Sequence, residues 1–253
     1  MLFFQDNLTV ERFPSRETMG RKAAADVAAR IHSLLKQQDQ VNLIFAAAPS
    51  QNEFLAALAS DSTIEWNRIN AFHMDEYVGL PDDAPQRFSR FLQDRLFDKV
   101  PIQKVFYMTP PEEGEDPSRE CQRYTDLLKQ YPTDIVCLGI GENGHIAFND
   151  PHVARFDDPQ WVKIVDLDAR CRLQQVHDGC FPVLEAVPTH ALTLTIPALT
   201  AAKSLYCIVP ARTKAQAVKR TLQGPISTEC PASILRRHPS ARLYLDADSA
   251  TLL

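Results

Sequence analysis

The 253-residue sequence lacks several features that would assign it to a specialised class of protein. It contains no apolar run long enough to cross a membrane, no internal repeat and no low-complexity segment. Its formal net charge of −5 disfavours nonspecific nucleic-acid binding, which depends on clustered positive charge. Residues 1–6 lack the basic start and sustained apolar core of a signal peptide. We therefore expect a cytoplasmic globular protein with neither a nucleic-acid nor a membrane partner.

The six cysteines form no recognisable framework. They are scattered, none belongs to a C-x-x-C pair, and Cys137 and Cys207 lie inside apolar runs, where cysteine behaves as a small hydrophobic residue. This pattern predicts free thiols in a reducing compartment, with no disulfides and no metal site.

What the sequence does contain is an alternation of strand-like and helix-like segments. Residues 16–35 have helical periodicity with Ser15 as a cap, and short apolar runs of strand length recur along the chain. The expected strands cover residues 41–47, 66–74, 103–108, 135–138, 162–166, 189–195, 203–209 and 241–245. This order predicts an α/β fold: a mainly parallel, doubly wound (Rossmann-like) sheet with helices on both faces. We expect residues 1–253 to form a single domain, with a polar turn at 110–116 and an irregular polar segment at 167–181.

The segment 134–150 contains the densest group of candidate functional residues. An apolar run at 135–138 is followed by a loop with three glycines: Gly139, Gly141 and Gly144. Glycines let a loop turn tightly and approach a ligand closely. The loop also holds His145, with Asn143 two residues before it and Asp150 five residues after it. In open α/β sheets, ligands bind at the carboxyl ends of the strands, so we predict a ligand site here.

A second segment has the same design. The expected strand at 66–74 is followed directly by Asp75 and Glu76, which we place in a loop. The carboxyl ends of parallel strands lie at one edge of a sheet, so these carboxylates and His145 are expected to meet in one crevice. Together they form a candidate general acid/base set.

These two segments carry a resemblance. Residues 72–80, Phe-His-Met-Asp-Glu-Tyr-Val-Gly-Leu, and residues 139–151, Gly-Ile-Gly-Glu-Asn-Gly-His-Ile-Ala-Phe-Asn-Asp-Pro, resemble the two signature segments of the glucosamine-6-phosphate deaminase (isomerase) family. The wider superfamily includes the 6-phosphogluconolactonases. The resemblance implies aldose–ketose isomerisation and deamination of an amino-sugar phosphate: glucosamine 6-phosphate and water give fructose 6-phosphate and ammonia. It implies a small sugar-phosphate substrate and no metal or organic cofactor.

The resemblance also implies catalytic roles. Asp75 matches the family's base at C2, and His145 matches its ring-opening histidine. Asn143 stands where some relatives have Asp, so it can orient the imidazole but cannot stabilise an imidazolium as a carboxylate would. Asp150 stands where the family has Glu, and its side chain is one methylene shorter, which puts catalytic efficiency in question.

Substrate-binding roles follow in the same way. The residues expected to bind substrate are Ser50, Gln51, Glu76, Gly144, Arg172 and Lys214. Glu76 is expected to orient the loop rather than react, and Lys214 matches a phosphate-binding lysine. The chain departs from the family at residues 47–51, Ala-Ala-Pro-Ser-Gln, where relatives have a glycine-containing loop that cradles the phosphate. Ser50 keeps a hydroxyl there, although a helix N-cap is an equally good interpretation of it.

Several alternatives stay open at this level. Arg172, His177 or Arg212 could complete the phosphate clamp. The chain could be a non-catalytic sugar-phosphate-binding relative or a 6-phosphogluconolactonase-like hydrolase. Neither the epimer of the hexosamine phosphate, nor an allosteric effector, nor the assembly state follows from the sequence, and a homo-oligomer is compatible with it.

Overall fold

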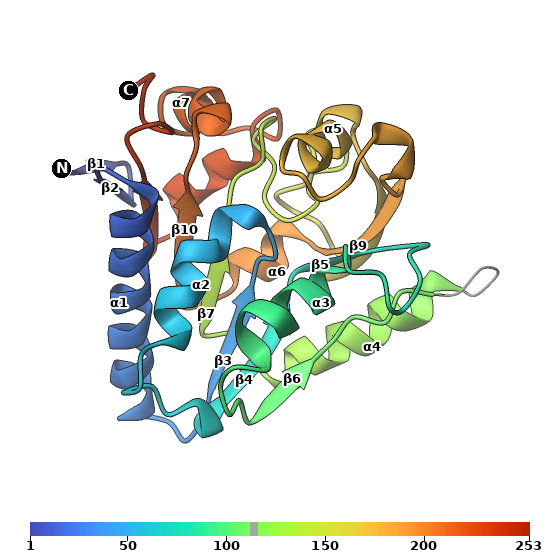
Figure 1. Ribbon diagram of the computed structural model, residues 1–253, viewed down its shortest axis with the longest axis horizontal. Coiled ribbons are helices and arrows are strands. Elements are labelled where there is room, and N and C mark those ends of the chain that lie inside the picture. The colour runs from blue at the N-terminus through green and yellow to red at the C-terminus, as the bar shows by residue number, and fades with distance from the viewer. Residues whose placement is uncertain (112–115) are drawn as a thin grey trace.

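The computed structural model describes residues 1–111 and 116–253. An eight-stranded sheet with the order β1-β2-β11-β10-β7-β3-β4-β6 forms the centre of the molecule (Figure 1). Its strands are β1 (Leu2–Gln5), β2 (Leu8–Arg12), β3 (Val41–Phe45), β4 (Ile69–His73), β6 (Lys104–Phe106), β7 (Ile135–Leu138), β10 (Ser204–Val209) and β11 (Ala241–Leu245). Only the β1–β2 hairpin is antiparallel; every other neighbouring pair in this sheet is parallel. The predicted mainly parallel α/β sheet is confirmed.

A smaller antiparallel sheet lies beside the large one. It has the order β5-β9-β8 and consists of β5 (Asp75–Tyr77), β9 (His190–Leu194) and β8 (Val162–Asp166). The prediction of a loop directly after β4 is therefore wrong, because Asp75 and Glu76 belong to strand β5. Pairing with β9 creates this strand, and that partner is far away in the sequence.

Seven α-helices are described, together with short 3₁₀ turns and one π-helical turn. The helices are α1 (Arg16–Leu35), α2 (Asn52–Ala59), α3 (Phe88–Leu92), α4 (Pro117–Gln130), α5 (Ala169–His177), α6 (Ile196–Thr200) and α7 (Ala215–Gln223). The expected cap of α1 is confirmed, since the Ser15 side chain accepts a hydrogen bond from the Thr18 amide. The polar segment expected to be irregular at 167–181 instead contains helix α5, which the sequence analysis did not predict.

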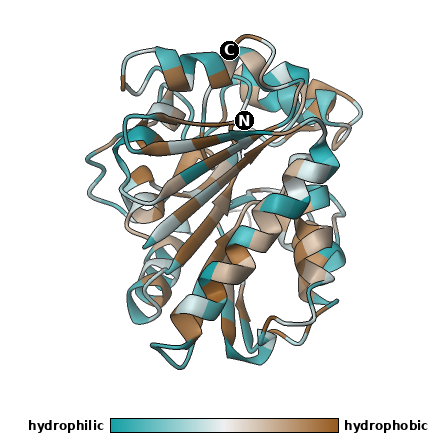
Figure 2. Cartoon of the chain, turned by 90° about the vertical axis from the view of Figure 1, so that its left-hand side faces the viewer, coloured by the Kyte–Doolittle hydropathy of each residue, from teal (hydrophilic) through white to brown (hydrophobic). Residues whose placement is uncertain are grey.

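The large sheet is covered on both faces, as expected. Strand β3 directs Leu43 and Phe45 into one hydrophobic cluster with α1 and α2, and Ile44 into another with α4, α6 and α7. Alternate residues of a strand point to opposite faces, so an uninterrupted apolar strand is what a two-sided core requires. Figure 2 shows the consequence: the central strands are mainly hydrophobic, whereas hydrophobic and hydrophilic residues alternate along the long helix.

Two further expectations concern the chain as a whole. Within residues 1–111 and 116–253, no helix combines the length and apolar character needed to span a membrane. The polar turn expected at 110–116 falls on residues 112–115, which lie outside the described part of the chain.

Candidate active site

Residues at the carboxyl ends of β3, β4 and β7, together with Lys214 in the segment after β10, border a cleft. Helix α5, which lies at this end of the strands (Figure 1), contributes Gln174 and Gln175 to its lining. The cleft encloses about 490 Å³ of empty space, part of it open to solvent. Its polar lining consists of Ser50, Asp75, His145, Gln174, Gln175 and Lys214, and its apolar lining includes Met74, Ile140, Ala147, Phe88 and Phe148. The sequence-based expectation that Asp75 and His145 meet in one crevice is therefore met.

Two glycines of the loop after β7 have no room for a side chain, and at Gly141 the reason is the histidine ring. A Cβ atom on Gly141 would lie only 2.1 Å from Cε1 of His145, so the imidazole packs directly on the Gly141 backbone. Gly144 has a φ of +94°, and a Cβ there would lie 2.7 Å from the sulfur of Cys230. Gly144 does not line the cleft, so it shapes the loop rather than contacting the space where a ligand would lie.

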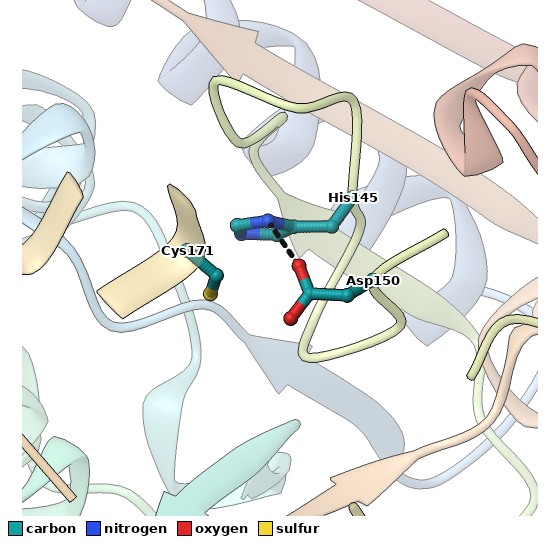
Figure 3. Close-up of side chains that lie close together, drawn as sticks. All are labelled: His145, Asp150 and Cys171. Atoms are coloured by element: carbon teal, nitrogen blue, oxygen red, sulfur yellow. Dashed lines mark ion pairs between the residues drawn. The ribbon is translucent and has the colours of Figure 1, made fainter. Parts of the chain in front are cut away.

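His145 is held by hydrogen bonds and an ion pair to Asn143 and Asp150, and Figure 3 shows its contact with Asp150. Nδ1 of His145 lies 2.8 Å from Oδ1 of Asn143 and 3.0 Å from Oδ1 of Asp150. The Asn143 amide donates to the same Asp150 oxygen at 2.8 Å, and the backbone amide of Asp168 donates to the other at 3.0 Å. Within the described residues no partner is found for Nε2 of His145, and this ring nitrogen is left for a ligand.

These contacts set the charge of Asp150. Burial by itself would raise the pKa of this carboxyl, but the hydrogen bond and charge of His145 and the donors on Asn143 and Asp168 lower the pKa to about 2. Asp150 is thus a carboxylate at neutral pH in direct contact with the imidazole. The sequence analysis expected the Asn143 position to lack the charge that stabilises an imidazolium; Asp150 supplies that charge, despite its shorter side chain.

Asp75 faces the cleft from the first position of β5. The residue is only 7% exposed, and burial, followed by the charge of the neighbouring Glu76, raises the pKa of its carboxyl well above the ordinary value. A carboxylate in such a place is a stronger base than one in water.

Glu76 has a different environment. It is fully buried, and its oxygens accept hydrogen bonds from the backbone amides of Tyr77, Phe88 and Ser89 and from the Ser89 hydroxyl. It does not line the cleft. The predicted orienting role agrees with these contacts, because Glu76 links β5 to the start of α3. The predicted contact of Glu76 with the substrate does not agree with its position away from the cleft.

The segment after β3 reaches the cleft through Ser50. The side chain of Gln51, which is buried, donates to the Ser50 hydroxyl at 3.1 Å and to the carbonyl of Ile208 at 3.1 Å. Ser50 lies inside the 3₁₀ turn Pro49–Gln51, whose N-cap residue is Ala48, so the N-cap interpretation of Ser50 is wrong. Gln51 does not line the cleft and instead holds Ser50 in place.

Lys214 lies across the cleft, where the chain enters α7. It is 4% exposed, and within the described residues its ammonium group has no hydrogen-bond partner. Burial lowers the pKa of Lys214, while the charges of Asp178 and Glu142 act in the opposite direction. A buried ammonium without a hydrogen-bond partner, beside an open cleft, has the chemistry needed to bind an anion.

The other candidates for a phosphate clamp do not line the cleft. Arg172 donates to the backbone carbonyls of Leu184 and Val187, His177 lies 3.4 Å from Glu142, and Arg212 is exposed. The α5 residues that do reach the cleft are the uncharged Gln174 and Gln175, which sequence reasoning missed. The Asp168 side chain, which caps α5 by accepting from the Arg170 amide, was the available signal for this helix.

One group of side chains has the composition of a metal site. His145, Asp150 and Cys171 offer donor atoms within 4.8 Å of one another (Figure 3). However, His145 and Asp150 already pair with each other, and burial together with the charge of Asp150 raises the pKa of the Cys171 thiol well above its ordinary value. Metals bind the thiolate, so this group is poorly suited to a resident ion.

The fold and the cleft define an α/β protein in which a carboxyl group, an imidazole and a buried lysine line one cleft near the carboxyl ends of parallel strands. The chain belongs to the family described as glucosamine-6-phosphate isomerases/6-phosphogluconolactonase, which matches residues 14–244. The glucosamine-6-phosphate deaminase of Listeria innocua is 36% identical over 214 residues, which is 85% of this chain and 88% of that protein. The corresponding Bacillus cereus enzyme is 35% identical over 222 residues, covering 88% and 82% of the two chains.

Solved structures agree with this assignment. A monomeric glucosamine-6-phosphate deaminase superposes with a TM-score of 0.86 at 28% identity, covering 96% of this chain and 99% of that one. The 6-phosphogluconolactonase of Thermotoga maritima superposes with a TM-score of 0.75 at 19% identity, covering 94% and 99%. The second similarity concerns the fold alone.

Proposed function

We propose that this chain is an enzyme that isomerises and deaminates glucosamine 6-phosphate, releasing fructose 6-phosphate and ammonia. The observation that carries the proposal is that the Asp75 carboxylate, the His145 imidazole and the unpaired Lys214 ammonium line one cleft. The reaction needs a base at C2, an acid/base near the ring oxygen and an anion site for the phosphate. Each of the three groups has the chemistry of one of these tasks.

Asp75 is proposed as the base that removes the proton from C2. Burial favours the neutral form of Asp75, so protonation of its carboxylate is more favourable here than in water. Delivery of the proton to C1 gives an imine at C2, and addition of water to C2 then breaks the C2–N bond, which releases ammonia and leaves the ketone of fructose 6-phosphate.

His145 is proposed as the group that opens the sugar ring. Asn143 and Asp150 hold its Nδ1 side, which leaves Nε2 to exchange a proton with the ring oxygen and O1. The ionised Asp150 favours the imidazolium that forms when the ring accepts a proton, as a carboxylate does for other catalytic histidines.

Lys214 is proposed to bind the phosphate group, with Ser50 as a neutral donor on the same cleft. The desolvation that destabilises the Lys214 ammonium is offset when an anion enters. Gln174 and Gln175 add uncharged donors from α5. In this proposal Gly144, Gln51, Glu76 and Arg172 support the site without touching the substrate.

A coupled assay of ammonia release from glucosamine 6-phosphate tests the proposal, with the Asp75→Asn variant measured beside the wild type. We expect turnover that the substitution reduces by at least about a hundredfold. Absence of ammonia from both glucosamine 6-phosphate and galactosamine 6-phosphate would contradict it. Hydrolysis of 6-phosphogluconolactone, or stabilisation by the sugar phosphate without turnover, would instead support the two alternatives, which the named relatives do not favour.

The setting of the enzyme belongs to the same proposal. All six cysteines are free thiols, which fits a reducing compartment such as the cytoplasm. We propose a single domain over residues 1–253, expected to unfold in one cooperative thermal transition. A homo-oligomer remains compatible with the chain, and light scattering of the purified protein distinguishes it from a monomer.

A further inference from the structure

His73 is a buried histidine beside the candidate base, and the reaction outlined above does not use it. It is the last residue of β4 and is completely inaccessible to solvent. Its Nδ1 lies 2.9 Å from the carbonyl oxygen of Asp75, and its Nε2 lies 2.8 Å from the backbone nitrogen of Met108. A carbonyl only accepts and an amide N–H only donates, so Nδ1 carries the proton and Nε2 accepts.

The Asp75 carbonyl depends on this contact because β5 is an edge strand. In an antiparallel pair, successive residues turn their backbone groups alternately toward and away from the partner strand. The Met74 carbonyl accepts from the Leu194 amide, and the Val78 amide donates to the His190 carbonyl, so the even-numbered residues face β9. The backbone groups of Asp75 therefore face the open side of the strand, where the His73 ring meets its carbonyl.

The His73 imidazole is neutral and is fixed in place by its two hydrogen bonds. Both nitrogens are bound to backbone groups, and burial lowers the pKa of His73 while the charges of Glu76 and of Glu120 on α4 act in the opposite direction. The backbone of His73 is fixed as well, because the Tyr124 hydroxyl lies 3.1 Å from its nitrogen and 2.9 Å from its carbonyl oxygen.

We propose that His73 is a positioning residue for Asp75. Its Nδ1–H fixes the backbone at the point where the chain leaves the large sheet at His73 and enters the small sheet at Asp75. That bend sets the direction in which the Asp75 carboxylate enters the cleft. The inference rests on the proposed function only in that Asp75 is taken as the base.

Two substitutions separate the two contacts of the ring. In His73→Asn the side-chain amide lies near the former Nδ1 and keeps a donor for the Asp75 carbonyl, but loses the acceptor for Met108. In His73→Gln the longer side chain keeps an acceptor near the former Nε2 and loses the donor for Asp75. His238→Gln is the matched control. That histidine is also buried and also bridges two backbone groups, the Ala202 carbonyl and the Ser240 amide, away from the cleft.

We expect His73→Gln to lower kcat by about 10- to 100-fold, since a small misplacement of a reacting group has that effect, with KM changed by less than about threefold. His73→Asn should keep kcat within about threefold of wild type while lowering the melting temperature. His238→Gln should lower the melting temperature and leave kcat unchanged. Equal losses of kcat in both His73 variants, or wild-type kcat in His73→Gln, would overturn the proposal.

A second readout does not depend on turnover. The pKa of the Asp75 carboxyl is measured by carbon-13 NMR, with the signal assigned through Asp75→Asn. We expect the pKa to fall toward the ordinary value in His73→Gln and to stay near the wild-type value in His73→Asn. If the wild type releases no ammonia, the proposed function fails, yet this titration still decides the role of His73. An unchanged Asp75 pKa in His73→Gln would contradict that role.

Discussion

Asp150 lies 3.0 Å from Nδ1 of His145, and the amide of Asn143 joins the two by contacting both. The carboxylate is completely buried, and its second oxygen accepts from the Asp168 backbone amide. The loop thus returns to the histidine through a residue five positions further along the chain. The imidazole therefore has both a neutral and an anionic partner on the same ring nitrogen.

The first prediction concerns this pair. Asp150→Asn keeps the shape of the side chain and removes its charge, so the imidazolium of His145 loses its buried partner. We expect kcat for ammonia release to fall by about 100-fold or more, with a smaller change in KM. Asp166→Asn serves as a control, because Asp166 pairs with His152 on the exposed surface. Full activity of Asp150→Asn would show that Asn143 alone is sufficient.

The second prediction concerns acid stability. The pKa of Asp150 is about 2 in the folded protein against an ordinary value of 3.8, so its ionisation stabilises the fold by about 2 kcal/mol at neutral pH. Because the folded-state pKa is depressed, this contribution is present above about pH 4 and is lost as the pH falls toward 2. Urea unfolding of wild type and Asp150→Asn between pH 6 and 3 measures it. The difference in unfolding free energy should shrink on acidification; a constant difference would contradict the assignment.

The third prediction has the opposite sign. Burial and the charge of Glu76 raise the pKa of Asp75 in the folded state. The folded protein therefore loses stability as the pH rises above the unfolded-state pKa, near 4, because the buried carboxyl must ionise. Asp75→Asn removes this cost, so at pH 7 the inactive variant should melt at a higher temperature than wild type. The gain should vanish below about pH 4, where both side chains are neutral.

Such a gain would identify Asp75 as a residue retained at the expense of stability, as functional sites often are. Lower stability of Asp75→Asn at pH 7 would instead mean that the charged carboxylate stabilises the fold.

Local pattern was sufficient where an element depends on its own residues. Strand β7 begins and ends where its apolar run does, and α1 begins directly after the Ser15 cap. The convergence of Asp75 and His145 also followed from the sequence, because parallel strands direct their carboxyl ends to one edge.

Local pattern failed where an element exists through distant partners. Asp75, Glu76 and Tyr77 form a strand because β9 pairs with them. Helix α5 is polar, with Cys171, Gln174 and Gln175 as its buried residues, so it has no apolar periodicity to read. Arg172 was selected for its charge, yet its guanidinium is used by two backbone carbonyls. Which cation faces the cleft depends on packing, which the sequence alone does not reveal.

The fourth prediction concerns Lys214, the cation that lines the cleft. Lys214→Met removes the buried ammonium from the cleft while keeping a flexible side chain of similar length. We expect KM for glucosamine 6-phosphate to rise by about 10- to 100-fold, which corresponds to the loss of one charge-assisted contact to the phosphate. Lys219→Met, on the exposed face of helix α7, which begins directly after Lys214, is the matched control and should leave KM unchanged.

The Lys214→Met variant should bind substrate more weakly and yet be more stable than wild type. Without an anion, the Lys214 ammonium is desolvated and unpaired, and burial lowers its pKa, so replacing it with an apolar side chain should raise the melting temperature of the ligand-free protein. Fructose 6-phosphate should then raise the melting temperature of wild type more than that of Lys214→Met, because at equal concentration a ligand stabilises the folded state more when it binds that state more tightly. A variant with an unchanged KM and equal stabilisation by fructose 6-phosphate would show that the phosphate is bound elsewhere in the cleft.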